Sequence, residues 1–184
     1  FPGAPLSLSK SAATLTKNIQ QTVARAGLAL YGAEPVCGLG ETLERVVKLS
    51  GRIIQIRQVE QGVGVGYGLT WIATSKTRLA IVGVGYADGW PRATSNKGAA
   101  WFEGFRLPIV GNVSMDSMVV DISELPEVSV REGDFVELIG PSQSLEQVAE
   151  SAGTISYEIL TRLSARLSRS YHYLTPDPGG GCPV

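Results

Sequence analysis

Hydrophobic and polar residues alternate in a series of short segments along most of the chain. Runs of this kind that are rich in Val and Ile and bounded by Gly, Pro, Asn and Asp are typical of β-strands. Strands are predicted at 6–9, 45–59, 79–84, 100–102, 107–110, 118–122 and 135–139. Many short strands separated by turn residues indicate an all-β barrel or sandwich for the central part of the chain.

Two further patterns complete the predicted elements. Glycine at every second position from 62 to 68 interrupts the strands, and a bulged or closely packed turn fits this spacing best. Near the C-terminus, Ser144 and Gln147 form a capping box before an apolar stripe, and Gly153 ends that helix. A second helix is predicted over about 157–167. The fold class is therefore mostly β, with one or two short helices near the C-terminus.

Composition excludes several classes of function. Charged residues make up 18% of the 184 residues and the formal net charge is -1, which argues against a nucleic-acid surface. No run of about 18 apolar residues exists, so no membrane-spanning segment is predicted. Two cysteines, Cys37 and Cys182, cannot build a disulfide framework, and His172 is the single histidine. We expect a cytoplasmic protein without a metal site.

The most informative string is Gly85-Tyr86-Ala87-Asp88-Gly89-Trp90-Pro91-Arg92. On physical grounds alone, it predicts an apolar strand that ends in a tight Asp-Gly turn. Such a turn presents Tyr86 and Arg92 at its rim. A hairpin with packed aromatic rings explains the same string without any function.

This string resembles the GYADG(W/Y)PR segment of alanine racemases, and four other strings match that family in order and at about its spacing. They are Ser11 to Thr14, Arg25 to Gly32, Val65 to Gly68, and Ile109 to Asp116. The resemblance runs from about residue 6 to about residue 170. Any one string is weak evidence for the family, whereas five strings in the same order and spacing are strong evidence.

The resemblance implies a fold-type III enzyme of pyridoxal 5'-phosphate (PLP). Residues 1–40 would be the last strands of its TIM-type (β/α)8 PLP-binding barrel. Residues 41–173 would form the C-terminal β domain, which is barrel-like, and 174–184 a flexible tail. The implied function is interconversion of L-alanine and D-alanine by a two-base lysine and tyrosine mechanism. The product would serve cell-wall peptidoglycan, or the reaction would serve D-alanine catabolism.

The resemblance also assigns roles around the substrate. Tyr67 would be the catalytic acid/base on one face of the substrate. A phenol in water ionises at about pH 10, so its base form requires neighbouring positive charge. Met115 would offer its main-chain N–H to the substrate carboxylate, and Tyr86 would narrow the pocket. Ring packing at a glycine turn is the structural alternative for Tyr67.

Four residues would bind the cofactor. Ser11 and the backbone N–H groups of Gly27 and Leu28 would hold the PLP phosphate, and Arg25 would face the pyridine nitrogen. Arginine does not give up its proton, so that nitrogen would stay unprotonated and the electron sink would be weakened. A helix cap for Ser11 and a surface ion pair for Arg25 are the structural alternatives.

The sequence departs from the family at three positions. Asn112 stands where arginine is usual, Lys10 where asparagine is frequent, and Ala165 where some members place a phosphate-contacting tyrosine. The departures concern the charge at the entrance to the site and the grip on the phosphate.

The PLP-bearing lysine of the family, in a KAxAYGHG-like segment, does not occur in these 184 residues. The chain starts at Phe1 without an initiator Met and is interpreted as the C-terminal part of a longer protein, inactive alone. In the family, the barrel of one subunit and the β domain of its twofold mate build each site. The expected partners are therefore a second copy, the missing N-terminal part and the substrate alanine.

Two other functions fit parts of the sequence. A fold-related PLP decarboxylase of basic amino acids would use a partner cysteine near an aspartate, but Ser114 precedes Met115-Asp116 here. A non-catalytic β-barrel interaction module fits the absent lysine and the net charge near zero. A racemase of broader specificity is a third interpretation, within the same family.

Overall fold

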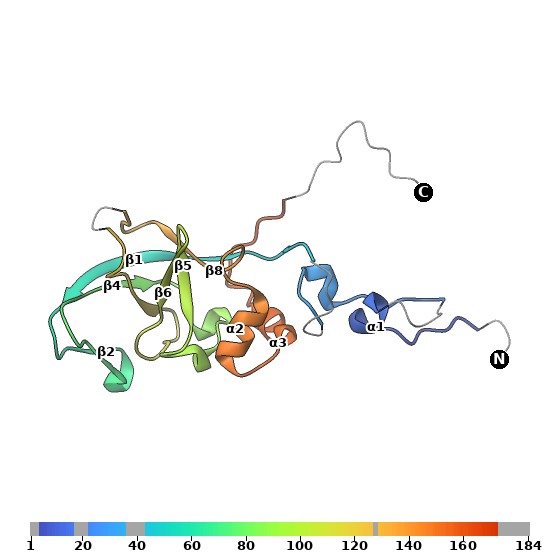
Figure 1. Ribbon diagram of the computed structural model, residues 1–184, viewed down its shortest axis with the longest axis horizontal. Coiled ribbons are helices and arrows are strands. Elements are labelled where there is room, and N and C mark those ends of the chain that lie inside the picture. Colours follow the sequence, from blue (N-terminus) through green and yellow to red (C-terminus); the bar gives the residue numbers. More distant parts are fainter. Residues whose placement is uncertain (1–3, 17–21, 36–42, 127–128, 173–184) are drawn as a thin grey trace, which may run out of the picture.

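The computed structural model describes residues 4–16, 22–35, 43–126 and 129–172. Figure 1 shows a β domain with two helices at one side, and an N-terminal arm that extends from it and carries a short helix. Both cysteines and the tail predicted at 174–184 lie outside the described residues. Within those residues, no helix has the length and apolar character needed to cross a membrane.

Six strands form one antiparallel sheet in the order β6-β5-β8-β1-β4-β7. Their bounds are β1 (Leu49–Val59), β4 (Thr77–Val82), β5 (Ala99–Phe102), β6 (Phe105–Pro108), β7 (Met118–Asp121) and β8 (Phe135–Ile139). The long strand β1 pairs with β8 through its first part and with β4 through its second part. Every strand predicted from residue 45 onward is thus confirmed, with ends that differ by a few residues.

The two edges of the sheet meet just after β6. Ile109 forms an antiparallel bridge with Val120 of β7, and the Val110 N–H donates to the Val119 carbonyl over 2.9 Å. The sheet is therefore nearly closed into a barrel, which leaves little strand edge unpaired. This confirms the predicted mostly β, barrel-like domain.

Apolar side chains from alternate strand positions fill the interior. The largest fully buried side chains include Ile53, Val82, Leu107, Met118, Val120, Val136 and Leu138. Each contributes roughly 1.5–3 kcal/mol by burial. Gly51 of β1 is a glycine because a Cβ there would lie only 2.4 Å from a methyl group of Val82.

Two helices cover one end of the barrel. In α2 (Leu145–Ala152), the Ser144 hydroxyl accepts from the Gln147 N–H and the Gln147 side chain accepts from the Ser144 N–H, which confirms the capping box. Gly153 ends α2 with a φ of 68°, as predicted. The second helix, α3 (Ser156–Arg162), ends earlier than predicted. After it the chain turns so that the Ser164 N–H donates to the Asp88 carbonyl over 3.0 Å.

The N-terminal arm differs from its prediction. Segment 6–9 is not a strand, and residues 11–15 form α1 (Ser11–Leu15). The Leu6 carbonyl accepts from the Val23 N–H, and the Ser9 carbonyl accepts from the Arg25 N–H. The two extended segments therefore run parallel to one another. A regular parallel ladder requires further strands at its sides, and the described residues supply one neighbour.

The end of α3 packs against the turn that follows β4. Gly89 in this turn has a φ of 99°, and a Cβ there would lie 2.0 Å from the Arg162 carbonyl oxygen. Trp90, which follows, is 1% exposed and donates its indole N–H to the Thr94 hydroxyl over 2.9 Å. Contact between α3 and the turn thus depends on a residue without a side chain at position 89.

We expect Gly89→Ala to destabilise the full-length protein more than Gly104→Ala does. Gly104 has a similar φ of 86°, but a Cβ there meets open space. Both variants lose about 1–2 kcal/mol because alanine disfavours positive φ, and only Gly89→Ala adds a collision of about 1–3 kcal/mol. Urea denaturation of both variants measures the difference, and equal losses of stability would contradict the close contact with α3.

Candidate active site

Tyr67 lies in a tight turn between two short strands, β2 (Gly64–Val65) and β3 (Trp71–Ile72). The chain reverses there because Gly66 and Gly68 adopt positive φ angles of 71° and 73°. Of the two forms predicted for the glycine run, bulged or closely packed, the turn is closely packed. It leaves the Tyr67 side chain 77% exposed. Packing in the core therefore does not explain the tyrosine at this position.

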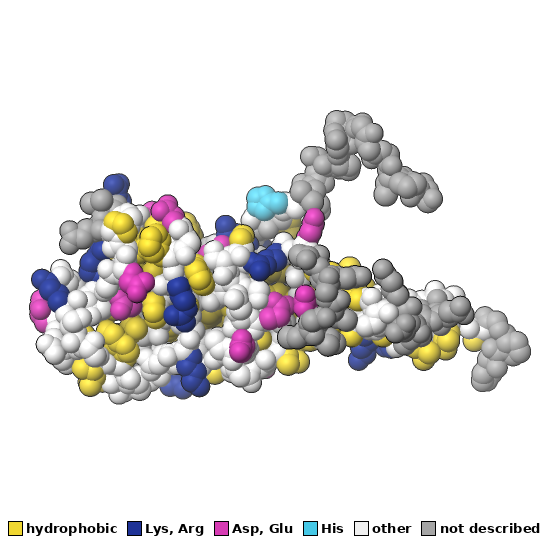
Figure 2. Space-filling model, in the orientation of Figure 1, with side chains coloured by type: hydrophobic (Ala, Val, Ile, Leu, Met, Phe, Trp, Pro, Cys, Tyr) yellow, Lys and Arg dark blue, Asp and Glu magenta, His cyan; other side chains and the backbone are white. Residues whose placement is uncertain are grey.

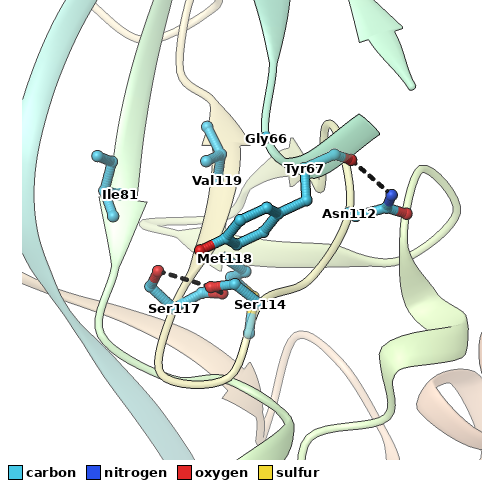
Figure 3. Close-up of a pocket in the computed structure, with 8 residues that line it drawn as sticks. All are labelled: Gly66, Tyr67, Ile81, Asn112, Ser114, Ser117, Met118 and Val119. Carbon is cyan, nitrogen blue, oxygen red and sulfur yellow. Dashed lines mark hydrogen bonds between the residues drawn. The ribbon is translucent and has the colours of Figure 1, made fainter. Parts of the chain in front are cut away.

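The Tyr67 turn packs backbone to backbone against the loop 110–117. A Cβ on Gly66 would lie 3.3 Å from the Asn112 backbone nitrogen, and a Cβ on Gly111 would lie 2.8 Å from the Val65 carbonyl oxygen. The Asn112 side chain donates from Nδ2 to the Tyr67 carbonyl over 2.8 Å (Figure 3). The two loops are thus in direct contact at glycines on both sides.

These two loops and the adjoining strands enclose a pocket of about 310 Å³, close to the lower end of the range of roughly 300–1,000 Å³ for ligand sites. Its lining residues are Gly66, Tyr67, Ile81, Asn112, Ser114, Ser117, Met118 and Val119. Figure 3 shows the Tyr67 ring across this pocket, with its hydroxyl end toward the side of Ser114 and Ser117. The Ser114 hydroxyl donates to the Ser117 carbonyl over 2.7 Å. The pocket thus combines apolar walls with a few hydroxyl groups.

Tyr86 lies against the loop 110–117, which contains Met115 and whose Ser114 lines the pocket. The Tyr86 N–H donates to the Ser114 carbonyl over 3.0 Å, and the Ala87 N–H donates to the Met115 carbonyl over 2.9 Å. The side chains of Tyr86 and Met115 are 41% and 53% exposed. Within the described part of the chain, no oxygen accepts a hydrogen bond from the Met115 N–H. This backbone donor is therefore available to a ligand.

Arg166 connects the C-terminal segment to both loops. Its guanidinium donates to the Asp116 carboxylate over 2.6 Å and lies 3.4 Å from an Asp88 carboxylate oxygen. The hydrogen bond with Asp116 and then the charge of Asp88 raise the pKa of Arg166 above its usual value. Asp88 in turn accepts from the Gly85 N–H over 2.9 Å, which shapes the turn that carries Tyr86.

The predicted cofactor residues lie together on the N-terminal arm. Ser11 is 2% exposed, and its hydroxyl accepts from the Gly27 N–H over 2.9 Å. Leu28 begins the 3-10 helix Leu28–Tyr31, and no described residue accepts from its N–H. Arg25 is exposed and lies just before Gly27. Ser11 does not cap α1, because Lys10 occupies the N-cap position without a side-chain hydrogen bond.

The two groups of predicted site residues lie far from one another. Figure 1 shows α1, which begins with Ser11, and β2, which precedes Tyr67, at opposite ends of the long axis of the molecule. One small molecule cannot contact both groups of the same chain.

Sequence reasoning missed several residues that shape the pocket. Ser117 lines it, and the Asn112 side chain supports the Tyr67 turn. The spacing Ser114-x-x-Ser117 is a local signal, because serine hydroxyls often bond to backbone groups a few residues away. The link from Arg166 to Asp88 and Asp116 crosses 78 and 50 residues of sequence, and no local pattern announces it.

Known proteins resemble this chain over most of its length. Residues 46–171 match the family model "Alanine racemase, C-terminal domain". A catabolic alanine racemase of Agrobacterium fabrum is 49% identical over 172 residues, which are 93% of this chain and 44% of that protein. An alanine racemase of Brucella ovis is 45% identical over 195 residues, and the match covers 98% of this chain and 48% of that protein.

Solved structures give the same result. The alanine racemase of Bartonella henselae with covalently bound pyridoxal phosphate superposes with a TM-score of 0.86 at 41% identity, over 94% of this chain and 48% of that one. The biosynthetic alanine racemase of Pseudomonas aeruginosa gives 0.83 at 40% identity, over 91% and 47%. This chain spans about half the length of the curated relatives it matches. By sequence and by fold, it belongs to the alanine racemase family.

Proposed function

We propose that the full-length protein interconverts L-alanine and D-alanine with PLP, and that Tyr67 is one of two opposed acid/base groups. The observation that carries this proposal is the position of Tyr67, exposed at a glycine turn over a pocket that Ser114, the neighbour of Met115, also lines. The related proteins are alanine racemases, and one holds covalently bound pyridoxal phosphate. A cytoplasmic location is part of the proposal, and two cysteines in 184 residues suit a reducing compartment.

Racemisation requires a proton to leave one face of a carbon and to return on the other face. A positioned acid/base group on each face accomplishes this. When bound, PLP would supply the electron sink that makes the α-proton acidic. Tyr67 would hold or move the proton on its face at the phenolic oxygen. The opposite group would be a lysine from a segment outside these 184 residues.

The arm is suited to hold the cofactor. The buried Ser11 hydroxyl and the Leu28 N–H are polar groups at the end of two parallel segments, where TIM barrels commonly bind phosphate. The Gly27 N–H donates to the Ser11 hydroxyl over 2.9 Å, so these polar groups lie together. Ser11 and the N–H groups of Gly27 and Leu28 would bind the phosphate. Arg25, exposed beside them, would donate to the pyridine nitrogen.

The substrate side is suited to a small amino acid. The Met115 N–H would donate to the substrate carboxylate, and the half-exposed Tyr86 ring would limit the space for a side chain. The backbone bonds between residues 86–87 and 114–115 hold both residues in a fixed relation. The loop shape, rather than the methionine side chain, would therefore determine carboxylate binding.

We further propose a homodimer in which each site uses the arm of one subunit and the Tyr67 end of its partner. The separation of the two groups in Figure 1 supports this arrangement. Large apolar side chains also reach the surface at both ends, and Figure 2 shows several along the arm. They include Leu6, Leu8, Val23 and Leu30 on the arm, and Tyr67, Leu69 and Ile72 around the turn. Exposed apolar groups of this size mark interaction surfaces.

In the full-length protein, we expect Tyr67→Phe to lower turnover by about 100-fold or more, the usual scale for a lost general base. The variant keeps the ring and removes only the hydroxyl. A packing role predicts almost no change in turnover and a stability loss of at most about 1 kcal/mol. Steady-state kinetics in both directions, with a melting curve as the control for folding, distinguish these roles.

The same variant should lose exchange of the α-proton unequally for the two enantiomers. Removal of the proton should fail for the enantiomer whose proton faces Tyr67, and should survive for the other through the opposite base. Wash-in of deuterium from D₂O, followed for L-alanine and D-alanine separately, measures this. Equal exchange rates for both enantiomers in Tyr67→Phe would overturn the assignment.

A mixing experiment tests the shared site. We expect Tyr67→Phe and Arg25→Ala dimers each to be nearly inactive, and a mixture of the two to regain activity after subunit exchange. In a mixed dimer, one site receives both defects and the other receives none. Random 1:1 mixing should therefore restore roughly a quarter of the wild-type activity. Sites built within one chain would give no recovery.

A further inference from the structure

We propose that Asn96 is a positioning residue that holds the Tyr67 turn against the loop presenting the Met115 N–H. The proposal rests on the proposed function, because it concerns how Tyr67 is placed for proton transfer. Asn96 lies between the turn after β4 and strand β5, and it does not line the pocket.

The Asn96 carboxamide bridges the two loops with both of its polar atoms. Its Oδ1 accepts from the Gly111 N–H over 2.6 Å, and its Nδ2 donates to the Thr70 hydroxyl over 3.0 Å. Gly111 begins the loop that leads to Met115, and Thr70 follows the helical turn Tyr67–Leu69 directly. One side chain thus fixes the distance between the acid/base turn and the carboxylate-binding loop.

The residue type at position 96 suits this task. Asn96 has a φ of 57°, in the left-handed region, where asparagine is among the few non-glycine residues found often. Asparagine also offers one acceptor and two donors on a short side chain, as the bridge requires. The Ser95 hydroxyl accepts from the Val113 N–H over 2.9 Å, so two adjacent side chains hold the same loop.

Asn96 follows a buried hydrogen-bond network centred on Thr94. Thr94, two residues before Asn96, is 0% exposed. Its hydroxyl accepts from the Trp90 indole and donates to the Pro91 carbonyl. The Lys97 and Gly98 N–H groups both donate to the Thr94 carbonyl. Displacement of Asn96 would therefore require movement of a buried network.

Among the described residues, the Tyr67 turn is held by its backbone contact with the loop 110–117 and by few side chains. Tyr67 and Leu69 are 77% and 61% exposed, so burial of apolar surface contributes little there. Two asparagine side chains make hydrogen bonds to the turn. Asn112 donates to the Tyr67 carbonyl, and Asn96 donates to the Thr70 hydroxyl. A displacement of about 1 Å at a catalytic group can cost 100-fold in rate. Loss of the Asn96 bridge should therefore act on turnover.

Asn96→Gly is the sharpest test, because glycine accepts the left-handed backbone conformation while it removes the side chain that carries the carboxamide. In the full-length protein, we expect kcat to fall by roughly 10-fold or more, with a smaller change in KM. The matched control is Glu103→Gly. Glu103 also has a left-handed φ, of 49°, but lies in the β5–β6 hairpin and is exposed. Glu103→Gly should leave kcat unchanged.

Thr70 supplies a second pair of variants that test the other end of the bridge. Thr70→Val keeps the shape of the side chain and removes the hydroxyl, and it should lower kcat in the same direction as Asn96→Gly. Thr70→Ser keeps the hydroxyl and should retain most of the wild-type kcat. The double variant Asn96→Gly/Thr70→Val should lose less than the product of the two single effects, because both remove one interaction.

Deuterium exchange separates positioning from a general loss of structure. If Asn96 places Tyr67, exchange should decline more for the enantiomer whose α-proton faces Tyr67 than for the other. A kcat within about twofold of wild type in both Asn96→Gly and Thr70→Val, or equal declines for both enantiomers, would overturn the proposal. A wild-type protein without racemase activity would instead overturn the proposed function, and this inference with it.

Discussion

The whole site depends on one backbone contact, between the Tyr67 turn and the loop that starts at Gly111. A side chain on Gly111 would meet the Val65 carbonyl, and one on Gly66 would crowd the Asn112 amide. Both glycines also have positive φ angles, so space and backbone conformation demand the same residue. Close approach brings Tyr67 and Ser114 into one pocket. The position of Tyr67, on which its proposed chemistry depends, therefore requires glycine at both positions.

Closure of the sheet places this contact. The bridge between Ile109 and Val120 joins the edges of the sheet immediately before Gly111, so the loop leaves the barrel at its seam. The turn that carries Tyr86 leaves β4 nearby, and its amides donate to the carbonyls of Ser114 and Met115. Three loops from different strands thus meet on one rigid wall. Hydrogen bonds between these loops thus connect the residues around the pocket.

The sequence predicted the barrel strands and helix α2 well. The alternation of hydrophobic and polar residues and the capping box at Ser144 are both local signals. It failed on residues 6–9, which pair with one segment among the described residues. It also failed on the end of helix α3, after which the Ser164 N–H donates to the Asp88 carbonyl. The glycine turn at Tyr67 was predictable from spacing. The bridge through Asn96 was not, because its partners Thr70 and Gly111 are set by tertiary contacts 26 and 15 residues away.

The exposure of Tyr67 fits the proposed site divided between subunits. At 77% exposed, its side chain gains little from apolar packing among the described residues. Its position must then come from hydrogen bonds, and asparagines supply them on both sides of Gly111. At one of these positions, Asn112 stands where the family usually has arginine, so a neutral amide supports the turn without adding charge. Around the Tyr67 turn, hydrogen bonds from two asparagine side chains thus take the place of apolar packing.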